Sequence, residues 1–266
     1  MKNNNLLLPA INAAISAGKR IMEVYAGDFK VDFKEDASPL TAADQKSNQE
    51  IMDFLLPFGI PIISEENKQL PFEERKKWEL CWLVDPLDGT KEFIKKNGEF
   101  TVNIALIEKG FPIMGVVYLP VQQILYFANE QIGSFKTQIN KNLVEELETL
   151  IQSSKKLNGK CNSTVYKIVA SRSHPSPATE EFIHQKEKIY GKIELVSKGS
   201  SIKLCLIAEG STHVYPRLAP TMEWDTAAAH AVAKFAGCKV YDYETGQELH
   251  YNKPDLLNPF FVVEGE

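Results

Sequence analysis

The sequence predicts a mixed fold of the α+β and α/β classes, in which layers of helices and sheets alternate. Its first half carries two amphipathic helical patterns, followed by short apolar runs separated by Gly and Pro breaks. Its second half alternates strand-like and helical runs. Such alternation is typical of sheets that are covered by helices. We therefore expect an α+β half over residues 1–154 and an α/β half over residues 155–266.

Two helices are expected near the N-terminus. Between Leu6 and Tyr25 the apolar residues recur at helical spacing, and Gly27 marks the expected end of this helix. A second helix is expected over 42–56. The stretch between the two is polar and loop-like, apart from a short expected strand at 30–33.

The rest of the first half is expected to be mainly strands. Apolar runs at 60–64 and 80–85 lead into acidic residues, which would place carboxylates at strand ends. Further runs at 100–107, 113–119 and 124–128 are separated by breaks that contain Pro or Gly. This pattern predicts an antiparallel meander.

The second half begins with a Lys- and Asn-rich stretch at 155–163. Six runs follow, in which strand-like and helical patterns alternate: 167–170, 179–188, 193–196, 202–209, 213–215 and 224–236. They predict a second sheet layered with helices.

The composition is that of a folded globular protein and not of a nucleic-acid binder. Of the 266 residues, 44% are hydrophobic and 24% are charged, which is far from the signature of disorder. The net charge of −5 argues against a nucleic-acid polymer as partner, because such binders usually carry a basic excess. A small anionic substrate is compatible with this charge, since metals and a few local cations can create a positive pocket.

Nothing in the sequence indicates a membrane span or a secretory signal. The apolar patch near the N-terminus is too short and too interrupted for either. The four cysteines form no Cys-x-x-Cys pair and are expected to be buried free thiols. The expected location is the cytoplasm, with peripheral association with a membrane left open, and the expected state is a monomer or a homodimer.

The strongest chemical signal is the run Asp85-Pro86-Leu87-Asp88-Gly89-Thr90 at the end of an expected strand. Pro86 fixes its own backbone angle and Gly89 permits a tight turn, so the two aspartates can converge. Paired carboxylates of this kind suit Mg²⁺. An isolated Asp-Gly is more often an ordinary turn with a capping residue, but the complete run favours a metal site.

Two further acidic sites have both a structural and a functional interpretation. Glu65 and Glu66 follow an apolar run, so one of them can face the same site, although acidic pairs are usually solvated. Asp225 opens an Ala-rich helix, where an aspartate is a natural cap. If that helix start faces the metals, Asp225 can also be a ligand.

Together these motifs resemble a known signature. The set Asp44, Glu65-Glu66, Asp85–Thr90 and Trp224-Asp225 resembles that of the inositol monophosphatase and fructose-1,6-bisphosphatase superfamily of lithium-sensitive phosphatases. The resemblance spans most of the chain. It implies a layered αβαβα sandwich of the sugar-phosphatase type and a phosphatase that uses two or three Mg²⁺ ions.

The resemblance also implies roles for individual residues. Asp44 and Thr90 would orient the attacking water. The first half would carry most metal ligands and the second half the substrate-binding residues and Asp225. The implied metal ligands are Glu65, Asp85, the Leu87 carbonyl, Asp88 and Asp225.

Motifs in the second half resemble one branch, the 3′(2′),5′-bisphosphate nucleotidases. They are 171–174 (Ser-Arg-Ser-His), 198–205 with its Gly-Ser-Ser turn, and 214–217. By this resemblance the substrate is 3′-phosphoadenosine 5′-phosphate, hydrolysed to AMP and phosphate, and the Gly-Ser-Ser turn would offer N–H groups and hydroxyls to a phosphate. The implied substrate-binding residues are Gly89, Thr90, His174, Ser200, Lys203, Arg217 and Asp225.

Several alternatives stay open at this point. The structural interpretations are a solvated helix residue for Lys203, a member of a surface ion pair for Arg217, and a turn residue for His174. An inositol monophosphatase or a related sugar-phosphate phosphatase is the second functional hypothesis. A phospho-aspartyl mechanism is disfavoured because the aspartates are three apart, and a zinc hydrolase because no His-x-x-x-His pair occurs. A catalytically inactive binding protein is the remaining hypothesis.

Overall fold

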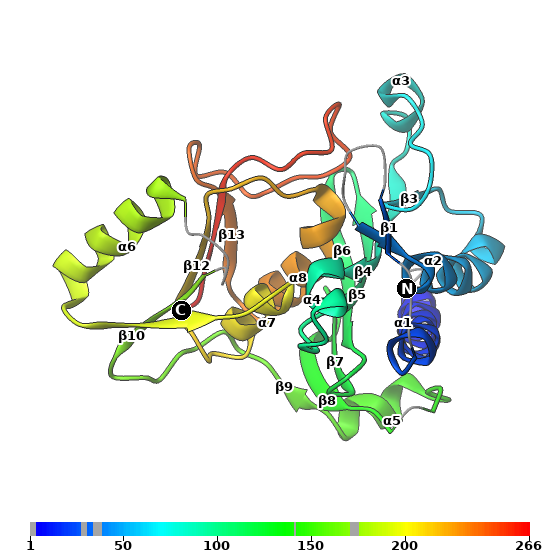
Figure 1. Ribbon diagram of the computed structural model, residues 1–266, viewed down its shortest axis with the longest axis horizontal. Coiled ribbons are helices and arrows are strands. Elements are labelled where there is room, and N and C mark those ends of the chain that lie inside the picture. The colour runs from blue at the N-terminus through cyan, green and yellow to red at the C-terminus, as the bar shows by residue number, and fades with distance from the viewer. Residues whose placement is uncertain (1–3, 28–30, 34–38, 141, 171–175) are drawn as a thin grey trace.

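The structure is a computed structural model that describes residues 4–27, 31–33, 39–140, 142–170 and 176–266. Five layers follow one another across the molecule (Figure 1). A helix pair covers one face of a large sheet, two further helices lie between this sheet and a smaller one, and a last helix covers the far side of the smaller sheet. The expected αβαβα sandwich is therefore confirmed.

The larger sheet is seven-stranded within the described residues, in the order β3-β4-β5-β6-β7-β8-β9. Only β3 and β4 run parallel, and the other neighbours are antiparallel, as the predicted meander requires. Strand β8 and the short β9 were not predicted. The bounds are β3 Ile62–Ser64, β4 Leu80–Asp88, β5 Thr101–Glu108, β6 Phe111–Leu119, β7 Ile124–Asn129, β8 Gly133–Gln138 and β9 Lys155–Lys156.

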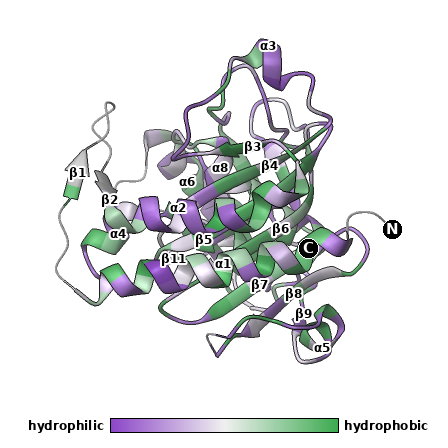
Figure 2. Cartoon of the chain, turned by 90° about the vertical axis from the view of Figure 1, so that its right-hand side faces the viewer, coloured by the Kyte–Doolittle hydropathy of each residue, from purple (hydrophilic) through white to green (hydrophobic). Residues whose placement is uncertain are grey.

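The first two helices, α1 (Asn4–Tyr25) and α2 (Ala42–Leu55), pack together on the outer face of this sheet. Figure 2, viewed from their side, shows both lying across the strands. Their apolar stripes are buried with the sheet side chains, for example Ile15 of α1 and Trp82 of β4. The two-stranded ribbon β1 (Val31–Phe33) and β2 (Pro39–Thr41) precedes α2, and β1 matches the strand expected at 30–33 as far as it is described.

Helices α7 (Ile202–Ala208) and α8 (Glu223–Phe235) fill the space between the two sheets. The surface of α8 is built largely of alanine, and its residues pack against β4, β5 and β6. At the closest point, a methyl group added to Gly115 of β6 would overlap the Ala228 carbonyl. The gap between sheet and helix thus requires the smallest residues.

The smaller sheet is mixed and five-stranded within the described residues, in the order β11-β10-β12-β14-β13. Helix α6 (Pro177–Tyr190) covers its outer face through Phe182. The strands are β10 Tyr166–Ala170, β11 Ile193–Ser197, β12 Val214–Arg217, β13 Lys239–Asp242 and β14 Phe261–Glu264. The first three were predicted, whereas β13 and β14 were not.

Short helices complete the described fold: η1 (Leu56–Phe58), α3 (Phe72–Arg75), α4 (Thr90–Ile94) and α5 (Leu147–Gln152). The chain passes from the larger to the smaller sheet between β9 and β10, close to the expected boundary at 155, and the division into two domains stays a prediction. All four cysteines are free, and three of them are buried. Across the described ranges, none of the helices has the length and apolar character needed to cross a membrane.

Candidate metal and phosphate site

Three carboxylates from distant parts of the chain converge at one edge of the larger sheet. Strands β3 and β4 run parallel, and the Glu65 N–H donates to the Val84 carbonyl at 3.1 Å, so Glu65 and Asp85 follow neighbouring strand ends. Asp225 reaches the same edge from the first turn of α8. Carboxylate oxygens of Glu65, Asp85 and Asp225 all lie within 4.8 Å of one another.

The turn after Asp85 has the geometry that its sequence predicts. The Leu87 N–H donates to Asp85 Oδ1 at 3.0 Å, and the pairing of β4 with β5 shifts between Asp85 and Asp88. Gly89 adopts φ of +95°, a conformation that L side chains rarely adopt. A Cβ at this position would also approach the Glu99 carbonyl at 3.2 Å. Gly89 is therefore needed for both its conformation and its small size.

Asp88 lies beside the three-carboxylate group and is held through one oxygen. Its Oδ2 accepts hydrogen bonds from the Ser201 N–H at 2.5 Å, from Thr101 Oγ1 at 3.4 Å and from Asn103 Nδ2 at 3.4 Å. The Ser201 hydroxyl donates to Asn103 Oδ1 at 2.8 Å, which orients the Asn103 amide. Asp88 is thus fixed by donors from both halves of the chain.

Asp225 both caps a helix and lies with the other carboxylates, so both expectations about its position hold. Its Oδ2 accepts the Met222 N–H at 2.9 Å, so it caps α8 as predicted. The same carboxyl group belongs to the converging cluster.

The cluster is electrostatically strained when no cation is present. Burial, together with the neighbouring carboxylates, holds the pKa of Asp85 and of Asp225 well above the usual range. Burial also raises the pKa of Asp88 to about 6, against the opposing effect of Lys203. A divalent cation would remove this repulsion, and an all-oxygen set of carboxylates suits Mg²⁺. The residues present therefore fit a metal site.

Asp44 and Thr90, the predicted water-orienting pair, also lie together. Thr90 Oγ1 is 3.3 Å from Asp44 Oδ1 and 3.4 Å from the Leu87 carbonyl oxygen. Asp44 is 2% exposed, and its Oδ2 accepts from the backbone and hydroxyl of Thr41 at 2.8 and 2.7 Å. The carboxylate is therefore held in place with one oxygen directed at Thr90.

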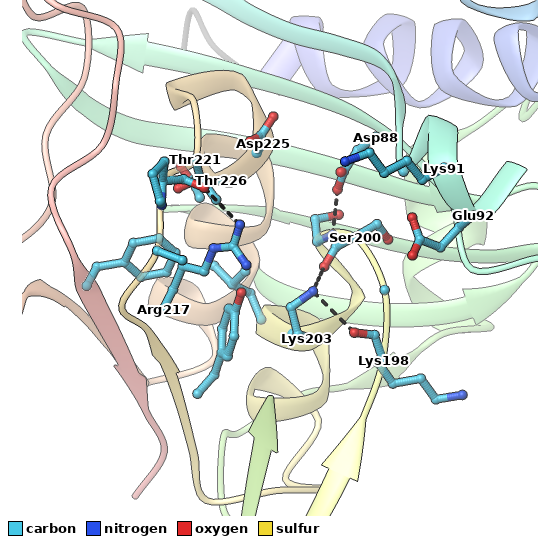
Figure 3. Close-up of a pocket in the computed structure, with 18 residues that line it drawn as sticks. Asp88, Lys91, Glu92, Lys198, Ser200, Lys203, Arg217, Thr221, Asp225 and Thr226 are labelled. Atoms are coloured by element: carbon cyan, nitrogen blue, oxygen red, sulfur yellow. Dashed lines mark hydrogen bonds between the residues drawn. The ribbon is translucent and has the colours of Figure 1, made fainter. Parts of the chain in front are cut away.

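A pocket of about 370 Å³ opens beside Asp88 and Asp225 (Figure 3). Its lining includes Lys203, which is only 5% exposed, so its interpretation as a solvated residue is wrong. Lys203 Nζ donates to the Ser200 carbonyl at 2.7 Å and lies 5.4 Å from the centre of the Tyr215 ring. Burial lowers the pKa of Lys203 to about 8, although Asp88 opposes this change.

The other predicted substrate residues occupy different positions relative to the pocket. Gly89, Ser200 and Arg217 line it, and Arg217 Nη2 donates to the Pro220 carbonyl at 2.8 Å. Thr90 adjoins it in sequence, at the start of α4. His174 lies outside the described residues.

One expectation about the Gly-Ser-Ser turn needs correction. The Gly199 N–H donates to Glu99 Oε2 at 3.0 Å, and the Ser201 N–H donates to Asp88. These two donors are therefore engaged with carboxylates of the chain and do not point freely at the pocket. Glu99, which also pairs with Lys198 Nζ at 3.0 Å, was missed because nothing near it in sequence signals a partner 99 residues away.

Comparison with known proteins gives concordant results over nearly the full chain. A family model described as the inositol monophosphatase family matches residues 2–263. The 3′(2′),5′-bisphosphate nucleotidase CysQ of Escherichia coli (strain K12) is 45% identical over 94% of this chain and 96% of its own length. The protein of that name from Haemophilus influenzae is 33% identical over 99% of this chain and 94% of its own length.

Solved structures show the same relationship. The crystal structure of CysQ from Bacteroides thetaiotaomicron superposes with a TM-score of 0.91 at 48% identity, and covers 98% of this chain and 97% of that one. An inositol monophosphatase from Anabaena has a TM-score of 0.72 at 21% identity, with 99% of this chain and 92% of that one covered, which shows a shared fold.

Proposed function

The chain belongs to the inositol monophosphatase family, and on this premise we propose that it is a Mg²⁺-dependent phosphomonoesterase. Its proposed reaction is the hydrolysis of 3′-phosphoadenosine 5′-phosphate to AMP and phosphate. One observation carries the proposal: a partly buried carboxylate cluster adjoins a pocket whose lining includes the cationic side chains of Lys203 and Arg217. The similarity to proteins named 3′(2′),5′-bisphosphate nucleotidase supports the choice of substrate.

In this proposal the carboxylate cluster holds two or three Mg²⁺ ions. Carboxylate oxygens of Glu65, Asp85 and Asp225 lie within 4.8 Å of one another. The hydrogen bonds that hold Asp88 go to its Oδ2, and its Oδ1 is the proposed metal ligand. The Leu87 carbonyl completes the proposed ligands. Mg²⁺ bound there would neutralise charge on the phosphate oxygens and lower the pKa of the attacking water.

Thr90 and Asp44 are the proposed residues for orienting that water. The Thr90 hydroxyl lies between the Asp44 carboxylate and the Leu87 carbonyl, so it can donate to one acceptor and accept a hydrogen bond from a water. Asp44 itself is fixed by Thr41. Such an arrangement restricts the position of the attacking oxygen, which is a large part of catalysis in phosphoryl transfer.

The pocket side of the site is proposed to hold the phosphate that is not cleaved. Lys203 brings a buried positive charge, Arg217 brings a guanidinium suited to phosphate oxygens, and Ser200 brings a hydroxyl. The proposed contact of His174 with the base or ribose remains a prediction from the sequence. A monophosphate has no group for this side of the site, which would favour bisphosphorylated substrates.

The proposal is tested by phosphate release from a panel of substrates with Mg²⁺ and with EDTA. The panel contains 3′-phosphoadenosine 5′-phosphate, AMP, inositol 1-phosphate and fructose 1,6-bisphosphate. We expect the first to give the highest kcat/KM and EDTA to abolish turnover. A higher kcat/KM for inositol 1-phosphate would replace the proposal by the inositol monophosphatase hypothesis, and binding without any release would indicate an inactive binding protein.

A further inference from the structure

A polar cluster around two buried side chains joins the segment after Glu65 to the start of α8. We define it as the clasp, consisting of Arg75, Asn252, Lys253 and Glu223. We propose that the clasp positions Glu65 relative to Asp225 and thereby sets the affinity of the site for divalent cations. The inference rests on the proposed metal site and concerns residues outside it.

Arg75 provides the first half of the clasp. It ends α3, it is 3% exposed, and its Nε donates to the Leu70 carbonyl at 2.9 Å within the segment that follows Glu65. Its Nη1 donates to Asn252 Oδ1 at 2.6 Å, and its Nη2 donates to the Lys253 carbonyl at 3.1 Å. Asn252 Nδ2 returns a hydrogen bond to the Arg75 carbonyl at 2.9 Å.

Glu223 provides the second half. It is fully buried in the first turn of α8, two residues before Asp225. Its carboxylate accepts the Asn252 N–H at 2.5 Å, the Lys253 N–H at 3.1 Å and the Lys253 ammonium group. The 252–253 segment is thus bonded to α3 on one side and to the first turn of α8 on the other.

The clasp has a geometric consequence for the metal site. Glu65 follows β3, which lies at the edge of the larger sheet and, among the described strands, pairs with β4 alone. Asp225 is carried by a helix that lies between the sheets. Carboxylates that must share a cation need to be held within a fraction of an ångström, and outer hydrogen-bonded partners usually provide this.

Surface solubility does not explain the clasp, because its charged side chains Arg75 and Glu223 are buried. Buried charges are expensive unless they are paired or hydrogen-bonded, and the 252–253 segment contributes partners to both Arg75 and Glu223. Asn252 adopts φ of +59°, which an asparagine tolerates better than most residues. A purely stabilising cluster would affect unfolding but would leave cation affinity unchanged, so the two roles can be separated.

The test is calorimetric titration of the metal-free protein with Mg²⁺, without substrate. The variants are Asn252→Gly, which tolerates the positive φ and deletes the amide, and Arg75→Met, which removes the charge. Glu209→Gln is the matched control. Glu209 pairs with Lys136 and so also joins the two halves of the chain, but it lies at the C-terminal end of α7, whereas Ser201 lies at its N-terminal end. Thermal unfolding in EDTA shows that each variant is folded and how much stability it loses.

We expect both clasp variants to raise the Kd for Mg²⁺ by about tenfold, the lower end of the effect of outer partners on metal sites. The control should lose stability and keep the wild-type Kd within about twofold. A folded Asn252→Gly protein with the wild-type Kd would overturn the inference while leaving the metal site intact. A wild-type protein that binds no divalent cation would overturn the metal site, and the clasp with it.

Discussion

Replacing Asp88 by asparagine should stabilise the metal-free protein while it abolishes turnover. Burial raises the pKa of Asp88 from its ordinary 3.8 to about 6. When a carboxyl group has a higher pKa in the folded than in the unfolded protein, the folded protein loses stability as the pH rises from the unfolded-state pKa to the folded-state pKa. The loss is complete above pH 6, so at neutral pH it amounts to about 3 kcal/mol, from a shift of about two units at 1.36 kcal/mol each.

Asparagine removes this unfavourable charge but weakens the contacts of Oδ2. Its amide oxygen can still accept from the Ser201 N–H, from Thr101 and from Asn103, as Asp88 does. A neutral acceptor is weaker than a charged one, and the pKa of Asp88 already contains this difference, because it reflects the balance of burial and these hydrogen bonds. The expected net gain is therefore about 3 kcal/mol at pH 7.5 in EDTA.

The assay is urea unfolding at pH 7.5, in EDTA and in Mg²⁺, with Asp53→Asn as a control on the exposed face of α2. The control should change the free energy of unfolding by less than about 0.5 kcal/mol. Mg²⁺ should stabilise the wild-type protein more than the Asp88→Asn variant, which should release no phosphate. If that variant unfolds at lower urea than the wild type in EDTA, the electrostatic reasoning is wrong.

Three further results are expected. Thr90→Val should lower kcat by about 10²- to 10³-fold at unchanged Mg²⁺ affinity, because it removes only the hydroxyl beside Asp44; a fall of less than tenfold in phosphate release would contradict this. Since burial lowers the pKa of Lys203 to about 8, kcat/KM for the bisphosphorylated nucleotide should fall as the pH rises through 8 and this cation is lost. In Lys203→Arg the fall should disappear from the pH profile, and its persistence would assign it to another group. Glu99→Gln loses the ion pair with Lys198 and should raise KM for the same substrate about two- to fivefold. An unchanged KM would show that Glu99 is not needed to hold the Gly-Ser-Ser turn in place.

The parts of the site that could be predicted from the sequence are those that local chemistry determines. The run from Asp85 to Thr90 has its own turn-forming residues, so its convergence follows from backbone preferences alone. Glu65 comes after an apolar run, and two parallel strands place such residues at the same edge of a sheet. Asp225 could be assigned to the site only through the order of the motifs, because its helix start also has an ordinary capping function.

Other features depend on partners far away in the chain. Glu99 and Glu223 look like common surface acids in the sequence, yet the structure buries both against backbone N–H groups. The N–H groups of the Gly-Ser-Ser turn were expected to be free because their acceptors are about 100 residues away. No local pattern contains this information.

The missed strands have two different causes. Strand β14 lies in a continuous apolar run, FFVV, that could have been assigned as a buried strand. Strand β8 has polar and apolar residues mixed near the margin of its sheet, and β9 has only two residues, so tertiary pairing decides both.

The narrow gap at Gly115 makes activity sensitive to a position with no chemistry of its own. Any larger residue there would have to displace the backbone of α8 at Ala228, and the same helix carries Asp225 in its first turn. A shift of even one ångström at a proposed metal ligand can reduce rates severely. A larger residue at Gly115 is therefore expected to reduce phosphate release through the position of Asp225.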